Sequence, residues 1–389
     1  MSEQNKFSKD FLWGAATSSH QVEGGTHNNW SEWEQSPERI ADLKKRGLHP
    51  SAFISGRACD HYHRFREDFD IAQSLGHNAH RFSIEWSRIE PQEGKFDEKE
   101  IEHYREVIKA LKERGMEPFV TLWHWTLPLW MRDAGGWENT ASGFYFARYC
   151  EKMANEFKNE VKFWLIINEP QYWVWHAYVA GVFPPQKKNI ISTARVYRNL
   201  IHGHKEAYIR LKAIDPHAQI GIVESTGWLA PFIFQPFQSL RNFLFPMCVR
   251  GYFDFFGLNY YRKNTLMGRK EKNISEIGWE IYPEGLYRLL TAAHRKFKKP
   301  IFVTENGIAD AKDEKRAAFI RDHVMGMKKA MDEGADVRGY FYWSLLDNFE
   351  WDSGFGPRFG LVEVDYTTLE RKIRPSARAY QELMQTRSA

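Results

Sequence analysis

This sequence contains no long apolar run and only three cysteines. No uninterrupted apolar stretch approaches the roughly 20 residues that a membrane-spanning helix needs, so we expect no membrane partner. The first residues, MSEQNKFSKDFLWGAA, do not combine a basic start with an apolar segment, as a secretory signal would, and they predict a cytoplasmic protein. Cys59, Cys150 and Cys248 are the three cysteines, in no metal-like spacing. We expect reduced thiols, without disulfides or zinc.

A large charge of one sign is also missing. The 54 lysines and arginines nearly balance 50 acidic residues, giving a net charge of +4, and basic residues alternate with acidic ones along the chain. This pattern is typical of a solvated surface, so we expect no nucleic-acid partner. Tryptophan, by contrast, is plentiful, with 15 residues gathered in segments such as NNWSEWE and LWHWTLPLW. Flat aromatic faces stack on sugars, although core packing alone also collects tryptophan.

Eight short apolar segments alternate with longer amphipathic ones that have apolar residues at three- and four-residue steps. Two of the amphipathic segments, 98–115 and 317–334, end in a glycine that can terminate a helix. Such alternation predicts an α/β fold, a single (β/α)8 TIM barrel that forms one catalytic domain over residues 1–389. The predicted strands are Phe11–Thr17, Ala79–Trp86, Glu117–Trp125, Phe163–Glu169, Ala218–Ser225, Phe253–Tyr261, Pro300–Asn306 and Val337–Leu345.

Two of these segments end in a carboxylate: LIINEPQ carries Glu169 and PIFVTENG carries Glu305. The carboxyl ends of barrel strands surround the mouth, where TIM barrels place their chemistry, so both side chains are predicted to face one cavity. A single glutamate at a strand end is more often structural, but two of them together favour a catalytic site. Such a pair suits cleavage of a glycosidic bond, with inversion or retention decided by the distance between the carboxyl groups.

Other polar and aromatic residues fall at the same strand ends and complete the predicted site. His124 alone would more often be a core histidine, and its surroundings have no metal-ligand spacing, so no metal site is expected. The neighbouring Glu85 and Glu224 receive no catalytic role. The strand-end residues are Gln21, Arg81, His124, Trp125, Asn168, Asn259, Tyr261, Trp343, Glu350 and Trp351.

Motifs along almost the whole chain resemble those of glycoside hydrolase family 1, the β-glucosidase-like retaining glycosidases. They include FLWGAATSSHQVEG, TLWHWTLPLWM, NEP, FDFFGLNYY, TENG and WSLLDNFEWDSGFGPRFGLVEVD, in the order found in that family. NEP and TENG are individually weak signals. Their order along one chain makes the resemblance specific.

The resemblance implies a role for each site residue. Glu169 of NEP would be the acid/base and Glu305 of TENG the nucleophile. Arg81 and Tyr261 would hold and polarise Glu305, and Asn168 would bond the sugar 2-hydroxyl. Trp343 would form a platform under the sugar ring. The predicted substrate-binding set is Gln21, His124, Trp125, Asn168, Asn259, Tyr261, Trp343, Glu350, Trp351 and Phe359.

The expected activity is therefore retaining hydrolysis of unphosphorylated β-glucosides and related β-galactosides or β-fucosides, without metal or organic cofactor. The partner would be a small-molecule or oligosaccharide β-glycoside, and the sequence leaves the oligomeric state open. A catalytically weak sugar-binding or regulatory protein on the same fold is the alternative.

Two departures from the family pattern stand out. Thr126 occupies a position where the family commonly has aspartate, and the segment between Trp228 and Phe253 is much shorter than usual. Trimming this connection predicts an open, weakly selective leaving-group side. The apolar residues of the segment would either pack on the barrel or form an exposed patch for self-association, and we expect packing.

Overall fold

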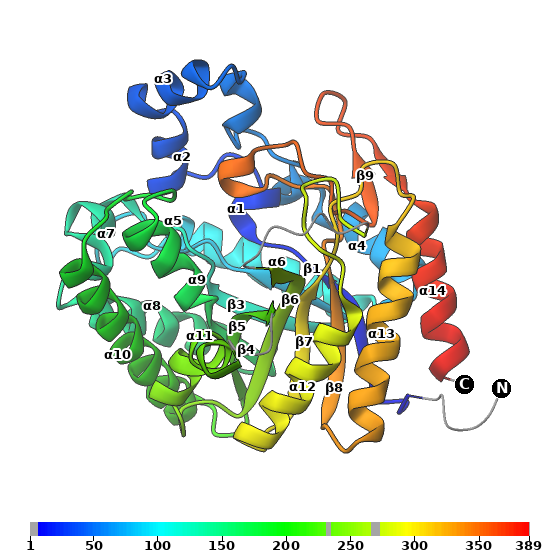
Figure 1. Ribbon diagram of the computed structural model, residues 1–389. Coiled ribbons are helices and arrows are strands. Elements are labelled where there is room, and N and C mark those ends of the chain that lie inside the picture. The colour runs from blue at the N-terminus through cyan, green and yellow to red at the C-terminus, as the bar shows by residue number, and fades with distance from the viewer. Residues whose placement is uncertain (1–6, 231–234, 266–272, 389) are drawn as a thin grey trace.

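Eight parallel strands close into a barrel in the computed structural model, which describes residues 7–230, 235–265 and 273–388 (Figure 1). Each strand pairs with its neighbours in chain order, and β8 closes the barrel against β1. The predicted TIM barrel is thus confirmed. The strands are β1 (Leu12–Ala16), β2 (Ala79–Ser83), β3 (Glu117–Trp123), β4 (Phe163–Asn168), β5 (Gln219–Ala230), β6 (Phe255–Thr265), β7 (Ile301–Asn306) and β8 (Val337–Trp343).

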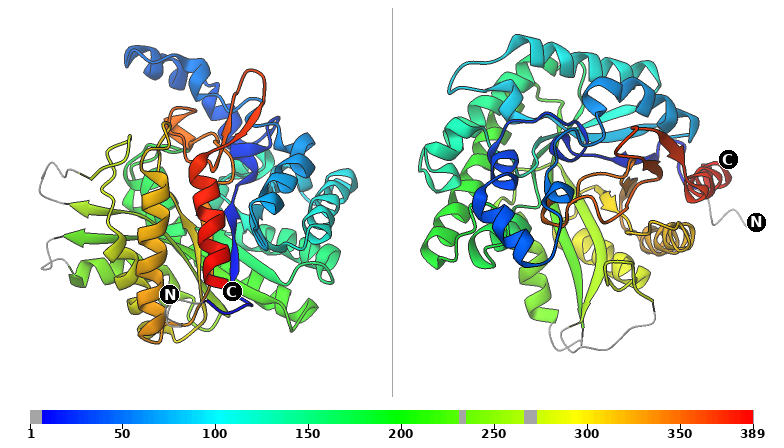
Figure 2. Two further views of the ribbon diagram at one scale, coloured as in Figure 1. Left: turned by 90° about the vertical axis from the view of Figure 1, so that its right-hand side faces the viewer. Right: turned by 90° about the horizontal axis from the view of Figure 1, so that it is seen from above.

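Helices surround the barrel and also cover its mouth (Figures 1 and 2). Short helices lie in the loops that follow β1 to β4, while longer ones form the outer ring. They are α1 (Ser19–Val22), α2 (Asn29–Glu34), α3 (Pro37–Lys45), α4 (His61–Ser74), α5 (Trp86–Ile89), α6 (Glu98–Glu113), α7 (Leu129–Asp133), α8 (Ser142–Phe157), α9 (Pro170–Val174), α10 (Ile190–Ile214), α11 (Gln235–Cys248), α12 (Pro283–Phe297), α13 (Arg316–Asp332) and α14 (Pro375–Ser388). A small antiparallel pair, β9 (Val362–Val364) and β10 (Arg371–Ile373), follows β8.

Helix α6 illustrates how the sequence determines the outer ring. The Asp97 side chain accepts hydrogen bonds from the N–H groups of Lys99 (2.9 Å) and Glu100 (3.3 Å), which caps the first turn. Ile101, Tyr104, Val107, Ile108, Ala110 and Leu111 form its buried face. Just beyond the helix, Gly115 has φ 70°, a left-handed conformation that glycine adopts readily.

The barrel interior is filled by aromatic rings rather than left as a channel. Phe119 stacks on Phe163 with ring centroids 4.3 Å apart, and also contacts Phe302 and Phe341. Trp343 and Phe359 belong to the same buried cluster, nearer the mouth. This packed layer forms a floor, so a ligand can enter only from the loop side.

Strand pairing becomes irregular toward the mouth. The register shifts between Leu165 and Asn168 on β4, and between Leu258 and Asn259 on β6. On β7 it shifts against β8 after Val303. Such irregularities change where a side chain points, and here they occur at the strand ends that carry Asn168, Asn259 and Glu305.

Strands β5 and β6 are longer than predicted and extend past the barrel as a two-stranded ribbon. They remain paired from Gly221↔Phe255 to Ala230↔Thr265, with one irregularity, and the ribbon projects at the left of the left-hand view in Figure 2. The short connection between them contains α11, which packs Phe243 and Phe245 inward but exposes Phe237 and Leu240. The predicted packing of this segment on the barrel therefore holds for one face of the helix.

Across the part of the chain that the structure describes, no helix is both long and apolar enough to cross a bilayer.

Candidate active site

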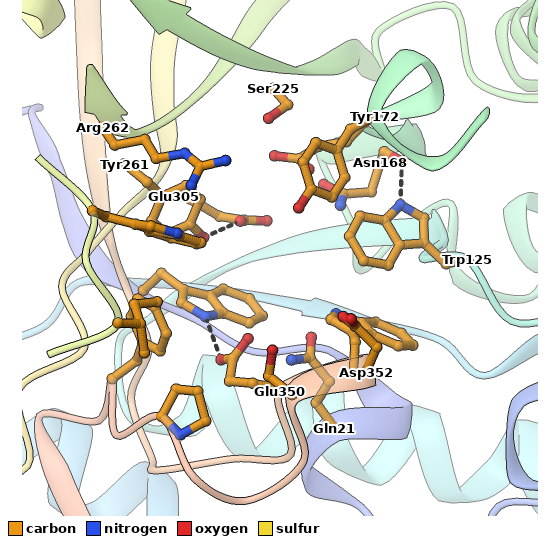
Figure 3. Close-up of a pocket in the computed structure, with 18 of the residues that line it drawn as sticks. Gln21, Trp125, Asn168, Tyr172, Ser225, Tyr261, Arg262, Glu305, Glu350 and Asp352 are labelled. Carbon is orange, nitrogen blue, oxygen red and sulfur yellow. Dashed lines mark hydrogen bonds between the residues drawn. The ribbon is translucent and has the colours of Figure 1, made fainter. Parts of the chain in front are cut away.

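A pocket opens at the barrel mouth, and residues from the ends of most strands and from the following loops line it (Figure 3). All predicted site residues line this pocket except Arg81 and Asn259, which lie directly behind it and contact its carboxyl groups. The lining members of the predicted set are Gln21, His124, Trp125, Asn168, Glu169, Tyr261, Glu305, Trp343, Glu350, Trp351 and Phe359.

Glu305, at the end of β7, has a cationic partner on one oxygen and a phenol on the other. Arg81 Nη1 donates to Glu305 Oε1 over 2.6 Å, and both side chains are buried. The Tyr261 hydroxyl donates to Glu305 Oε2, as Figure 3 shows. Burial, and next the charge of Glu305, hold the pKa of Tyr261 well above its ordinary value, so the phenol keeps the proton it donates. A guanidinium and a phenol together stabilise a carboxylate.

Glu169 sits in a different environment, just after β4. Asn259 Nδ2 donates to Glu169 Oε1 over 2.8 Å, and among the described residues no arginine or lysine forms an ion pair with this carboxyl. Burial, and next the charge of Glu305, raise the pKa of Glu169 to about 8. Glu169 therefore holds a proton near neutral pH.

The backbone at Glu169 is strained as well as buried. Its φ of 45° lies in the left-handed region, and Pro170 follows as the first residue of α9. The Glu169 N–H donates to the carbonyl of Val223 on β5 over 3.0 Å, which ties this turn to the neighbouring strand. Trp125 (φ 80°) and Trp351 (φ 51°) are strained in the same way. Strained backbone of this kind is common at functional sites.

A hydrogen-bond chain orients Asn168 and His124. Arg81 Nη2 donates to Asn168 Oδ1 over 2.6 Å, so the Asn168 amide nitrogen points the other way, 3.1 Å from His124 Nε2. Burial, and next the charge of Arg81, lower the pKa of His124 well below its usual value, which leaves the ring neutral. An amide nitrogen only donates, so His124 Nε2 accepts and Nδ1 carries the proton. That buried Nδ1 has no partner in the described parts of the chain and is a free donor.

Glu350, in the loop after β8, lies across the pocket from Ser225 and Arg262 (Figure 3). Trp343 Nε1 donates to Glu350 Oε1 over 3.0 Å (Figure 3). Burial raises the pKa of Glu350 to about 8, while the Trp343 hydrogen bond opposes that shift. Nearby, Gln21 in α1 donates to the carbonyl of Phe349 over 2.7 Å and accepts from Ser18. These contacts fix the amide and carboxyl groups that face the pocket.

Several lining residues were not predicted from the sequence. Arg262 directly follows the predicted Tyr261, and Asp352 directly follows Trp351, so adjacency was the available signal. Tyr172 in α9 and Arg241 in α11 lie on helices that only the folded chain brings to the mouth. The residues missed include Tyr172, Ser225, Arg241, Arg262, Trp279 and Asp352.

The unusual Thr126 lies outside the pocket lining. Its buried hydroxyl is 3.0 Å from both carboxyl oxygens of Glu85, which also accepts hydrogen bonds from Ser19 and Ser87. Glu85 thus belongs to a buried polar network beneath the α1–α2 region. An aspartate in place of Thr126 would set a second carboxyl beside Glu85, whereas threonine supplies a donor.

Within residues 7–230, 235–265 and 273–388, no group of three or more His, Cys, Asp or Glu side chains is arranged to hold an ion. The chemistry that the arrangement itself offers is a protonated carboxyl group and an arginine-paired carboxyl group facing one pocket.

Comparison with known proteins matches this chain to a family. The sequence profile of glycosyl hydrolase family 1 matches residues 3–243 and 261–389. The chain is 32% identical to β-glucosidase A of Thermotoga maritima, covering 96% of this chain and 97% of that one. It is 31% identical to a β-galactosidase of Saccharolobus solfataricus, covering 97% and 94% respectively.

Solved structures give the same result. The structure of the β-glucosidase from Thermotoga maritima in complex with deoxynojirimycin superposes with a TM-score of 0.91 at 32% identity, covering 99% of this chain and all of that one. The β-glycosidase from Pyrococcus horikoshii gives a TM-score of 0.89 at 36% identity, with 98% and 96% covered. The unmatched residues 244–260 overlap the connection between β5 and β6. These residues comprise the end of α11 and the start of β6.

Proposed function

Because the chain belongs to glycosyl hydrolase family 1 and is a glycoside hydrolase, we propose that it cleaves β-glycosides with retention, through a covalent glycosyl-enzyme. We further propose that residues 1–389 act as one catalytic domain. The observation that carries the mechanism is the contrast between the two carboxyl groups: Glu169 carries a proton near neutral pH, and Glu305 is paired with Arg81.

In the first step, the Glu305 carboxylate attacks the anomeric carbon while the Glu169 carboxyl donates its proton to the glycosidic oxygen. The carbon–oxygen bond to the leaving group breaks, and the leaving group departs as a neutral alcohol. Arg81 and Tyr261 hold Glu305 in position for attack. A glycosyl ester on Glu305 and an ionised Glu169 result.

In the second step, Glu169 removes a proton from water, and the resulting hydroxide attacks the anomeric carbon from the face that the leaving group vacated. The ester bond breaks, which releases the sugar and restores the Glu305 carboxylate and the protonated Glu169. Two displacements at one carbon retain the β configuration.

The glycone is proposed to be glucose, galactose or fucose without a phosphate group. His124 Nδ1–H, the Gln21 amide and the Glu350 carboxyl offer directional hydrogen bonds to hydroxyls, and Trp343 offers a flat face. Relatives named as a β-glucosidase and a β-galactosidase support glucose and galactose. On the wall around Glu350, the described lining residues include no lysine or arginine to bind a phosphate.

Product stereochemistry tests the mechanism directly. Hydrolysis of 4-nitrophenyl β-glucoside, followed by proton NMR at early times, should release β-glucose before the anomers equilibrate. Initial release of the α-anomer would show inversion and reject the covalent intermediate.

Azide products test the assigned roles. Glu305→Ala should lose turnover and, with azide, form the α-glycosyl azide, because azide takes the place of the nucleophile. Glu169→Ala should still form the glycosyl-enzyme from substrates with good leaving groups and, with azide, give the β-product. Azides of the opposite configurations would exchange the two assignments.

A further inference from the structure

The leaving-group side of the pocket carries two guanidinium groups. Arg241 comes from α11 and Arg262 from the extended part of β6, and both line the same pocket as Glu169 and Ser225. In the proposed mechanism Glu169 protonates the departing oxygen. The pocket residues around Glu169 that do not contact the sugar are therefore the ones that contact the leaving group. Figure 3 shows Arg262 beside Tyr261, with Ser225 and Tyr172 on the same side of the pocket, whereas Gln21 and Glu350 lie on the other.

Neither arginine is neutralised. Within residues 7–230, 235–265 and 273–388, no carboxylate forms an ion pair with Arg241 or Arg262, and no hydrogen bond from either guanidinium is present. Neighbouring Lys263, by contrast, pairs with Glu280 over 2.5 Å. Most arginines of this chain have carboxylate partners. Two arginines without such a partner at a pocket wall are therefore suited to binding an anionic ligand.

The acids close to the pair do not supply the missing charge near neutral pH. The pKa of Glu169 is raised to about 8, and burial raises the pKa of Glu224 well above its ordinary value. Partial desolvation, and next the charge of Arg262, lower the pKa of Arg241, which indicates two cations acting on each other. Asp352 also lines the pocket, but Figure 3 places it across from Arg262, beside Gln21.

Arg262 is held in position as well as unpaired. Its guanidinium carbon lies 4.7 Å from the centroid of the Trp279 ring, and Trp279 in turn contacts Tyr261 and Phe359. Stacking of this kind fixes the plane of a guanidinium and leaves its N–H donors free for a ligand in that plane. An oxyanion with two acceptor atoms matches such a donor set.

The geometry points to a leaving-group subsite for anionic aglycones, in which Arg241 and Arg262 bind a carboxylate or sulfate on the departing alcohol. This inference rests on the proposed function and specifies its substrate class. This inference differs from the prediction of a weakly selective leaving-group side, which is based on the short β5–β6 connection. That connection contains α11, and α11 contributes Arg241 to the pocket lining.

A matched pair of substrates tests the subsite. The β-glucosides of 4-hydroxybenzoate and 4-hydroxybenzamide share the glycone and the ring and differ in one negative charge. We expect kcat/KM to favour the carboxylate substrate at least about ten-fold at low salt, with the preference shrinking as salt is added. Free 4-hydroxybenzoate should likewise inhibit more strongly than free 4-hydroxybenzamide, which tests the subsite without any variant.

Variants separate the subsite from intrinsic leaving-group reactivity. Arg241→Gln and Arg262→Gln should each reduce the carboxylate-to-amide ratio, and the double variant should reduce it at least about ten-fold. Arg321→Gln, at an exposed arginine of α13, is the matched control and should preserve the wild-type ratio. An unchanged ratio in the double variant, or equal inhibition by the two free phenols, would overturn the subsite.

The position of the negative charge provides a second discrimination. A 6-phospho-β-glucoside places its charge on the sugar, toward Glu350, and should be a poorer substrate than its unphosphorylated counterpart in both wild type and double variant. A 6-phospho preference that the arginine substitutions abolish would assign the pair to the glycone instead. Failure to hydrolyse even the amide substrate would contradict the proposed function rather than the subsite.

Discussion

Glu169 and Glu305 have the same side chain, and their environments give them different properties. Glu305 touches a guanidinium and a phenol, whereas Glu169 accepts from an uncharged amide and is buried against a second carboxyl. Asn259 connects the two environments, because its Oδ1 accepts from Thr304, the residue before Glu305, over 2.6 Å. Asn259 thus links Glu169 to the residue that precedes Glu305.

The pH dependence of the reaction follows from the protonation of Glu169. Its pKa is raised to about 8, and the first step needs its proton, so kcat/KM for 4-nitrophenyl β-glucoside should decline as pH rises through about 8. The decline should approach ten-fold per pH unit above that point. Initial rates at low substrate concentration between pH 5 and 10 measure it.

Glu350 has a pKa raised to the same range and supplies the control. Glu350→Gln removes its titration but not that of Glu169, so this variant should bind glucosides more weakly and retain the alkaline decline. Loss of the decline in Glu350→Gln would assign the alkaline limb to sugar binding and not to proton donation.

At the scale of elements, the chain just after β7 passes very close to the end of β8. Gly307 follows the TEN segment of β7, and a Cβ atom added there would lie 1.8 Å from the carbonyl oxygen of Trp343. Glycine is required because of this close backbone approach. The ends of the strands that carry Glu305 and Trp343 are thus held against each other by this close approach.

Gly307→Ala should therefore displace the chain after β7 and the end of β8. We expect a loss of unfolding free energy of about 1–3 kcal/mol from overpacking, and a decrease in kcat on the order of 100-fold for a displacement near 1 Å. Thermal melting and kcat per folded molecule measure the two effects. Gly356→Ala, where the nearest atom is 3.7 Å away, is the control and should change neither. Equal melting temperatures and equal kcat values for the two variants would show that the chain after β7 can move away from β8 without disturbing the site.

The elements also show how far sequence reasoning extends. Periodicity located all eight strands, because apolar strand segments differ from amphipathic helices in length and spacing. It did not predict that β5 and β6 continue to Ala230 and Thr265, because Ser225 and Thr226 interrupt the apolar run of β5 and residues 262–265 are polar. These strand ends are held by pairing with each other. The site residues that were predicted lie at strand ends or in recognised motifs. Arg241 was missed because its place depends on how α11 packs.

At the scale of the whole molecule, folding buries carboxyl groups outside the catalytic pair. Glu224 on β5 is fully buried behind the pocket, where Oε2 lies 3.3 Å from Gln171 Nε2. Its Oε1 has no partner in the described parts of the chain. Burial raises its pKa well above the ordinary value, as it does for Glu169 and Glu350. Unfolding exposes all three groups to water, where each ionises in the usual range.

This difference sets the sign of the pH dependence of stability. Above the ordinary glutamate pKa the unfolded chain has lost these protons while the folded chain keeps them, so the folded state binds more protons. The free energy of unfolding should consequently fall with rising pH, by about 1.4 kcal/mol per unit for each such group. For Glu169 and Glu350 the fall should extend from the ordinary glutamate range to about pH 8.

Glu224→Gln isolates one contribution, because glutamine matches the shape of the protonated acid and cannot ionise. The variant should lie closest to wild type at pH 5, because that pH is only slightly above the ordinary glutamate pKa and wild type has lost only about 1 kcal/mol of stability at this position there. Its advantage over wild type should grow as pH rises, because only wild type then loses stability at this position. Thermal melting at pH 5, 7 and 9 measures the difference, and Glu113→Gln, at an exposed glutamate of α6, is the control that should follow wild type throughout. A constant difference between Glu224→Gln and wild type across this range would mean that Glu224 ionises in the folded protein as it does in the unfolded chain, and that Gln171 and its surroundings stabilise a buried charge.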